Sequence, residues 1–226
     1  SPVAGPRAEP STGARPAPRV FEDVRWTVGQ ALRTRTFWLL NLGILLVNFP
    51  GASIYIHMSS YFQDKGMEAP AAAGALSVYA LGALIGRAVW TSIILRLGLY
   101  RALVAFAVIY GSGILVFALV TGPWALVAAA LALGISIGGS AQLQAQIWPD
   151  YFGRRIVGAL SGYGALMVIP AQAGGPLLAA FMFDVTRSYA LIFLIYGALC
   201  YLAGLAFFAA PRPKPPAPTA AMFEGG

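Results

Sequence analysis

Residues 71–95, AAAGALSVYALGALIGRAVWTSIIL, decide the fold that this sequence predicts. The stretch is continuously apolar and carries one charge, Arg87. An α-helix needs about 20 apolar residues to cross about 30 Å of hydrocarbon, and this stretch is long enough. A spanning strand would need about half that length and would alternate apolar and polar residues. The stretch therefore predicts a transmembrane helix that holds a cation within the membrane.

The composition of the whole chain agrees with that prediction. Of 226 residues, 58% are hydrophobic and only 10% are charged, which excludes a soluble domain. The formal charge of +7 comes from basic residues at the ends of apolar runs, a pattern that disfavours nucleic-acid binding. The single cysteine, Cys200, precludes an intrachain disulfide. We find no spacing typical of a metal or cofactor site and no nucleophile and base pair, so we do not expect an enzyme.

Charged, proline and glycine residues divide the chain into six predicted spans between two polar segments. The spans are 37–61, 71–95, 102–121, 124–148, 157–182 and 189–209. Residues 1–36 form a Pro/Ala/Arg-rich linker, within which 21–33 predicts a short interfacial helix, and 210–226 form a disordered tail. The predicted fold class is an all-α membrane protein with a six-helix domain over 37–209.

Basic residues orient the six spans. On the side of the two termini lie Arg25, Arg33, Arg35, Arg96, Arg101, Arg154, Arg155, Arg212 and Lys214. The opposite side has only Lys65 and Arg187. The positive-inside rule therefore predicts that both termini are cytoplasmic. We expect a multi-pass protein of the bacterial inner membrane.

Two short sequence motifs of the first three spans recur in the last three. GALSVY at 74–79 returns as GALSGY at 158–163, and Arg101 with Ile109–Gly111 returns as Arg187 with Ile195–Gly197. A repeat of three spans enters the membrane from the opposite side the second time. The sequence thus predicts two inverted three-helix repeats, a construction that recurs in secondary transporters. Chance similarity among six helices is the alternative.

Several motifs resemble one transporter family. Residues 86–101, from Gly86-Arg87 to the terminal Arg101, resemble the signature that joins the second and third helices in each half of the major facilitator superfamily. Gly98 matches, whereas Leu95 stands where the loop aspartate is expected and Thr91 replaces a common glycine.

Two further segments narrow the resemblance. The loop 149–155, PDYFGRR, is similar to the loop between helices ten and eleven of oxalate/formate antiporter-like and monocarboxylate carriers. FWLLNLGILL at 37–46 resembles the entry to helix seven. The resemblance implies helices seven to twelve, the C-terminal half of a twelve-helix fold whose N-terminal half would be a partner.

The resemblance also implies roles for individual residues. An arginine at the place of Arg87 is implicated in carboxylate binding in such carriers, and a guanidinium inside a membrane needs an anion, a carbonyl or water as its partner. The alternative is that Arg87 is a gating residue bonded to carbonyl oxygens at a helix end. The motif residues expected to serve gating or loop roles are Gly86, Gly98, Arg101, Arg154 and Arg155. Residues 157–182 lack the lysine of oxalate carriers, so a doubly charged substrate is disfavoured. Ala83 replaces an acidic residue of animal monocarboxylate carriers, so a salt-bridge switch at that position is not expected.

Other polar residues within the spans are candidates for substrate contact. Ser136, Ser140 and Gln144 share one face of the fourth span, and Asn48 precedes Pro50, which should weaken or kink the first span. The remaining candidates are Tyr79, Tyr163 and Gln172. Bonding between helices, or simple packing, is the alternative for each of them. The one histidine, His57, is expected at the external interface.

The sequence therefore predicts the C-terminal half of a secondary transporter that moves a small organic anion by alternating access, with a monocarboxylate favoured. One alternative is a self-contained six-helix protein that acts as a dimer. Another is a non-transporting membrane scaffold with interaction elements in its Pro-rich ends.

Overall fold

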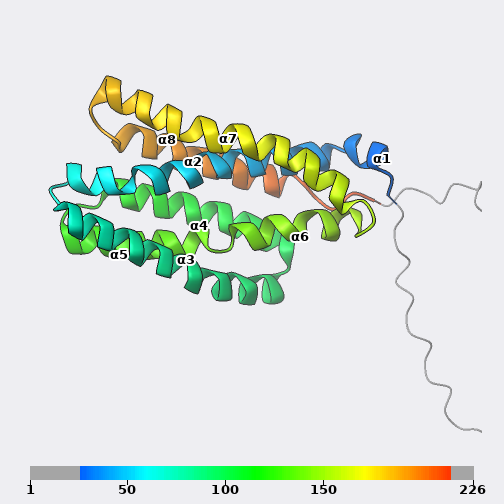
Figure 1. The fold of residues 1–226 in the computed structure, drawn as a ribbon. Helices are drawn as coiled ribbons and strands as arrows, with labels where there is room; N and C mark the ends of the chain where they lie inside the picture. Colours follow the sequence, from blue (N-terminus) through cyan, green and yellow to red (C-terminus); the bar gives the residue numbers. More distant parts are fainter. Residues whose placement is uncertain (1–25, 215–226) are drawn as a thin grey trace, which may run out of the picture.

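The computed structural model describes residues 26–214, and these form a bundle of antiparallel helices (Figure 1). The helices are α1 (Val28–Leu32), α2 (Arg35–Asp64), α3 (Ala69–Leu97), α4 (Leu99–Leu119), α5 (Pro123–Ile137), α6 (Ser140–Phe152), α7 (Val157–Thr186) and α8 (Ala190–Phe208). Six spans are long and apolar enough to cross a membrane, with α5 and α6 together forming the fourth. The prediction of six spans in an all-α fold is confirmed.

The helix ends differ from the prediction where aromatic packing extends a helix. The loop predicted at 149–155 is helical as far as Phe152, although Pro149 lies inside α6. The last turn of α6 is held because Phe152 packs edge-on against Trp26, with ring centroids 5.4 Å apart, and also contacts Phe37. Pro149 has no N–H to donate to the preceding helical turn. The stabilisation from burying these aromatic rings is larger than the loss of that one backbone hydrogen bond.

The fourth span is not the continuous helix predicted over 124–148. It is interrupted at Gly138 and Gly139, between α5 and α6. The indole of Trp90 in α3 donates a hydrogen bond to the carbonyl oxygen of Ile135 at 3.2 Å. In an unbroken helix that carbonyl would accept from the amide of Gly139 one turn later. At the interruption, the Trp90 indole of α3 therefore replaces the backbone amide as the donor to the Ile135 carbonyl.

The helices pack in three close pairs, α3 with α5, α2 with α7, and α4 with α8. The first pair meets backbone to backbone. A methyl group on Gly86 would overlap the carbonyl of Ile135, and one on Gly138 would overlap the carbonyl of Ala83. Small residues four apart commonly permit such an approach in membranes. The same arrangement at Gly82 and Gly134 extends the contact along both helices.

The three close helix pairs are the same when two sets of helices are exchanged. One set is α2, α3 and α4, and the other is α5/α6, α7 and α8 in that order. Exchanging the two sets turns the α3–α5 pair into the α7–α2 pair and leaves α4–α8 unchanged. At the α4–α8 crossing, a Cβ on Gly111 would lie 3.1 Å from the carbonyl oxygen of Gly197, and one on Gly197 would lie 3.4 Å from that of Gly111. Gly111 and Gly197 occupy equivalent positions in the two copies of the repeated sequence motif. An inverted repeat requires this reciprocity, and the repeat itself stays a prediction.

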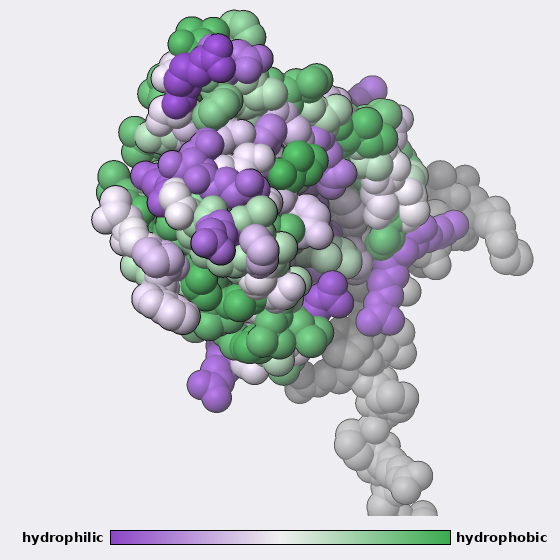
Figure 2. All heavy atoms as spheres, turned by 60° about the vertical axis from the view of Figure 1, so that its left-hand side comes forward, coloured by the Kyte–Doolittle hydropathy of each residue, from purple (hydrophilic) through white to green (hydrophobic). Residues whose placement is uncertain are grey.

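The surface is divided by polarity. Hydrophilic side chains gather at the end of the bundle that carries the α2–α3, α4–α5 and α7–α8 connections, and hydrophobic side chains cover much of its flank (Figure 2). Of the six spans, α3 and α7 bury the smallest share of their apolar residues. Large hydrophobic residues are exposed on both, including Leu84 and Ile169.

The segment that follows α8 is fixed as far as Lys214, which corrects the prediction of disorder from residue 210. Ala210 is fully buried, and its carbonyl accepts a hydrogen bond from Tyr151 at 3.3 Å. The Thr36 hydroxyl donates to the Pro211 carbonyl at 2.9 Å. Arg212 pairs with Asp150, and this hydrogen bond raises the pKa of Arg212 above its ordinary value. These contacts tie the segment to α2 and α6.

The predicted terminal segments are described only in part. Residues 1–25 of the linker and 215–226 of the tail lie outside the described residues. The interfacial helix predicted over 21–33 is represented by α1, which starts with a capping box between Thr27 and Gln30.

Candidate substrate-binding site

Arg87 lies near the middle of the second span. It follows the midpoint of α3 by four residues, or about 6 Å at about 1.5 Å per residue. Gly86 and Trp90 occupy the face of α3 that packs on α5, so Arg87 is directed away from this contact. Its side chain is exposed and forms no hydrogen bond or ion pair with the described residues 26–214. At membrane depth such a guanidinium needs a partner.

A polar contact joins α3 to α6 one helical turn from Arg87. The Thr91 hydroxyl donates to the Arg87 carbonyl at 2.8 Å and lies 3.4 Å from Oε1 of Gln142. Its one hydrogen is shared between these acceptors, because a hydroxyl has a single proton to donate. Neither Thr91 nor Gln142 is a predicted site residue. The signal that could have found Gln142 is the spacing of Gln142 and Gln146, which places two polar side chains on one face of the fourth span.

A second polar contact joins α6 to α2. Asn48 donates to the Ile44 carbonyl at 2.7 Å and lies 3.4 Å from Oε1 of Gln144. Ser140, half-buried, begins α6 one turn before Gln144. The structure thus brings together Asn48 and Gln144, with Ser140 one turn away on the same face of α6. Ser136 lies beyond the interruption, is buried, and donates to the Ala132 carbonyl instead.

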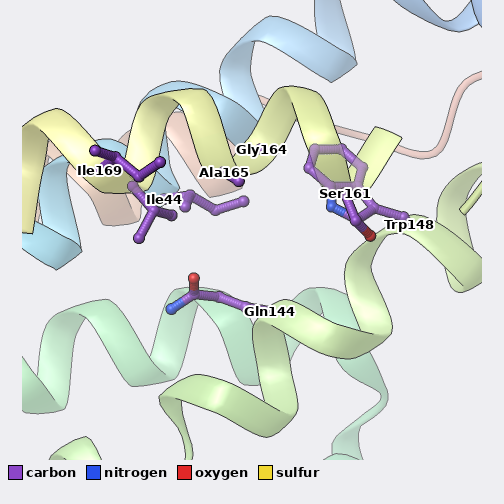
Figure 3. A pocket seen from close by; sticks show the side chains of 8 residues that line it. Ile44, Gln144, Trp148, Ser161, Gly164, Ala165 and Ile169 are labelled. Atoms are coloured by element: carbon purple, nitrogen blue, oxygen red, sulfur yellow. The ribbon is translucent and has the colours of Figure 1, made fainter. Parts of the chain in front are cut away.

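Beside this contact is an open hollow of about 260 Å³ between α2, α6 and α7. The hollow is lined by Ile44, Gln144, Trp148, Ser161, Gly164, Ala165, Val168 and Ile169. Figure 3 shows the Gln144 amide projecting from α6 toward Ile44 and Ala165, with Trp148 of α6 and Ser161 of α7 at the other end of the hollow. The lining is mostly apolar, with a few polar groups, as is typical of small-molecule sites.

The other predicted substrate residues lie apart from this hollow. Tyr163 of α7 is 42% exposed and packs edge-on against Phe37, with ring centroids 6.3 Å apart. Tyr79, which occupies the equivalent position in the repeated motif, is only 6% exposed and packs beside Tyr55. Gln172 is exposed on α7, farther along than the hollow.

The predicted gating residues lie at one end of the bundle, except for Gly86. Gly98 joins α3 to α4 with a φ of 76°, a backbone conformation that favours glycine. Arg101 is exposed in the first turn of α4. Arg154 and Arg155 are exposed between α6 and α7. Gly86 instead provides the close approach of α3 to α5.

His57 has a larger structural role than the interfacial position that the sequence predicts. Its Nε2 lies 3.1 Å from the Pro176 carbonyl of α7, and its Nδ1 lies 3.3 Å from the Tyr189 hydroxyl at the start of α8. A neutral imidazole protonated on Nε2 satisfies both partners, donating to the carbonyl and accepting from the hydroxyl. His57 therefore links three helices. Within the described residues, no group of His, Cys, Asp and Glu could hold a metal ion.

Comparison with known proteins assigns the chain to a family. The family model of the Major Facilitator Superfamily matches residues 40–225. The chain belongs to the major facilitator superfamily. This family is one of transporters, and the expectation of a transporter rather than an enzyme is confirmed at that level.

Relatives within the superfamily agree with this assignment. Monocarboxylate transporter 11 of Homo sapiens is 30% identical over 202 residues, covering 83% of this chain and 42% of its own length. Monocarboxylate transporter 13 of Bos taurus is 26% identical over 196 residues, covering 81% of this chain and 46% of its own. The chain therefore spans less than half the length of these relatives.

A solved structure shares the fold. The superfamily transporter FucP in an outward conformation matches with a TM-score of 0.68 and 19% identity, covering 83% of this chain and 46% of FucP. The match to about half of FucP confirms that the six spans form one half of a superfamily fold.

Proposed function

We propose that this chain is the C-terminal half of a secondary transporter that binds a small organic anion, favouring a monocarboxylate, and works by alternating access. The observation that carries the proposal is the Arg87 guanidinium, which lies near mid-span, exposed, and free of any partner within residues 26–214. A guanidinium is always charged and pairs with a carboxylate through two parallel hydrogen bonds. A substrate carboxylate would supply the missing partner.

Three features support the choice of a monocarboxylate. The two curated relatives reported above are named monocarboxylate transporters. The part of α7 up to Met182 has no Lys, Arg or His, so no second cation faces the site from that helix. Asn48, Ser140 and Gln144 are neutral and can bond the uncharged part of a substrate. A single fixed cation matches a single negative charge.

The complete transporter requires further elements. The chain covers less than half of its relatives, so we propose that an N-terminal six-helix half completes the cavity, in the same gene product or as a separate subunit. The exposed apolar sides of α3 and α7 would face that half or the lipid. We also propose that the membrane is a bacterial inner membrane and that both termini lie in the cytoplasm, the side that the distribution of basic residues favours.

Uptake of labelled acetate into proteoliposomes that hold the complete gene product tests the proposal. Arg87→Ala is expected to reduce the initial rate at least about tenfold, because hydrogen bonds to a charged group contribute about 1.5–3 kcal/mol. Arg96→Ala, at the end of the same helix, is the matched control and should stay within about threefold of wild type. Unchanged uptake by the Arg87→Ala protein would refute the binding role.

A further inference from the structure

We propose that a second hollow, at one end of the bundle, binds the phosphate group of an anionic phospholipid. This basic hollow is lined by Leu97, Gly98, Leu99, Tyr100, Arg101, Pro211 and Arg212. It lies between the α3–α4 connection and the segment after α8, which share one end of the bundle (Figure 1). None of these residues belongs to the site proposed for the transported anion, so the inference goes beyond the proposed function and does not depend on Arg87.

The basic hollow is large enough for a ligand and open to the surface. Its volume is about 460 Å³, within the range of about 300–1,000 Å³ that is typical of small-molecule sites. A Cβ on Gly98 would meet no atom within 4 Å, so no protein atom fills the space beside this turn. A ligand can therefore enter without a rearrangement of the helices.

Two arginines from distant parts of the sequence line the basic hollow. Arg101, exposed in the first turn of α4, forms no ion pair or side-chain hydrogen bond within residues 26–214. Arg212 donates from its Nε, at 3.2 Å, and from one terminal nitrogen to a single oxygen of Asp150. A guanidinium has five N–H donors, so Arg212 keeps donors for a second acceptor. Two guanidinium groups against one carboxylate leave a net positive charge, which suits a phosphate.

Both walls of the basic hollow are anchored to the bundle. The Tyr100 hydroxyl donates to the Phe208 carbonyl at 2.7 Å, which joins the start of α4 to the end of α8. On the other wall, the Pro211 carbonyl accepts from Thr36 of α2 at 2.9 Å, and Asp150 of α6 holds the neighbouring arginine. Because the walls are already held in place, binding has to order few further groups.

Exposed apolar side chains beside the basic hollow favour a lipid over a soluble anion. Leu97 is exposed within the lining itself. Phe208, whose carbonyl contacts Tyr100, is exposed at the end of α8, and Leu205 is exposed about one turn farther into the span. These side chains provide an apolar surface for an acyl chain while the phosphate stays at the arginines. Basic pockets between membrane helices bind lipid head groups in this way.

Binding can be measured as stabilisation, because a ligand that binds only the folded protein raises its unfolding temperature. The complete gene product, stripped of lipid in detergent, is titrated with phosphatidylglycerol, and the concentration that gives half of the maximal rise is determined. For Arg101→Ala this concentration should be at least about tenfold higher, since a hydrogen bond to a charged group is equivalent to about one order of magnitude or more in affinity.

Arg155→Ala is the matched control. It removes the same charge from an arginine that is exposed at the same end of the bundle but does not line the basic hollow. Its half-maximal concentration should stay within about twofold of wild type. If the lipid-free protein does not stay folded, native mass spectrometry from micelles that contain phosphatidylglycerol decides instead. Arg101→Ala should then retain one phosphatidylglycerol molecule fewer than Arg155→Ala, and equal retention would overturn the inference.

Two further ligands identify the source of the phosphate. Phosphatidylcholine, which has no net charge, should need at least about tenfold higher concentrations than phosphatidylglycerol for the same rise. Inorganic phosphate should give no rise at the concentrations where phosphatidylglycerol acts. Equal potency of inorganic phosphate would assign a soluble anion and overturn the lipid, and equal responses of Arg101→Ala and Arg155→Ala would overturn the site. These outcomes are independent of the uptake test of Arg87, so failure of one proposal leaves the other standing.

Discussion

Arg87 owes its orientation to the residue before it. Gly86 lets the backbone of α3 touch α5, and the next side chain along the helix is thereby turned away from that contact. A larger residue at position 86 would push the helices apart and disturb the position of Arg87. The glycine expected to act in gating has a packing role in this structure, and any role in motion stays a prediction.

Replacing this glycine tests the packing argument. Gly86→Ala should destabilise the protein by about 1–3 kcal/mol, because the added methyl group overlaps the Ile135 carbonyl and overpacking of this kind costs that much. Gly74→Ala is the control, since a Cβ there meets no atom within 4 Å. Alanine favours helix over glycine by up to about 1 kcal/mol, so the control should be neutral or more stable. Thermal unfolding in detergent measures both, and equal effects would contradict the argument.

At the level of helices, the interrupted fourth span depends on a neighbouring side chain. The Ile135 carbonyl is freed where α5 ends and is satisfied by the Trp90 indole, which is almost fully buried. A buried carbonyl without a partner would be unfavourable. The interruption also places the start of α6, and with it Gln142 and Gln144, opposite α3 and α2.

A single substitution isolates that hydrogen bond. Trp90→Phe retains an aromatic ring but removes the indole donor, and we expect a loss of about 1–3 kcal/mol in unfolding free energy. Trp38→Phe removes an indole hydrogen bond of 2.9 Å to the Leu32 carbonyl, but Trp38 is 55% exposed. Water can replace that bond, so the control should lose less than about 1 kcal/mol. Similar losses in both variants would show that the hydrogen bond at the interruption is unimportant.

The spans could be predicted from the sequence because uninterrupted apolar runs such as 71–95 have only one structure that satisfies the backbone in lipid. The interruption at Gly138-Gly139 could not, since glycines are common in continuous membrane helices and the decisive contact comes from Trp90, which is distant in sequence. Arg87 was identifiable as a charge in an apolar run. The contact between Asn48 and Gln144 depends on tertiary packing that no local pattern specifies.

At the scale of the whole molecule, charge is distributed unequally between the two ends. The end with the α3–α4 and α6–α7 connections carries Arg96, Arg101, Arg154 and Arg155. At the opposite end, acidic residues outnumber basic ones, with Asp64, Glu68 and Asp184 against Lys65 and Arg187. This asymmetry is the basis for placing the basic end in the cytoplasm.

Labelling of single cysteines tests the orientation. In a Cys200→Ala background, Ser188→Cys at the α7–α8 connection should react with a membrane-impermeant maleimide on intact cells. Arg155→Cys, exposed between α6 and α7, should react only after the membrane is permeabilised. The reverse pattern would place the termini outside the cell.

The central claim, that Arg87 receives the carboxylate of the transported anion, is tested most directly by a cryo-EM structure of the complete gene product with bound phenylacetate. The account predicts carboxylate oxygens about 2.7–2.9 Å from the guanidinium nitrogens of Arg87. A bound anion elsewhere, with Arg87 paired to a protein carboxylate or to backbone carbonyls, would contradict it.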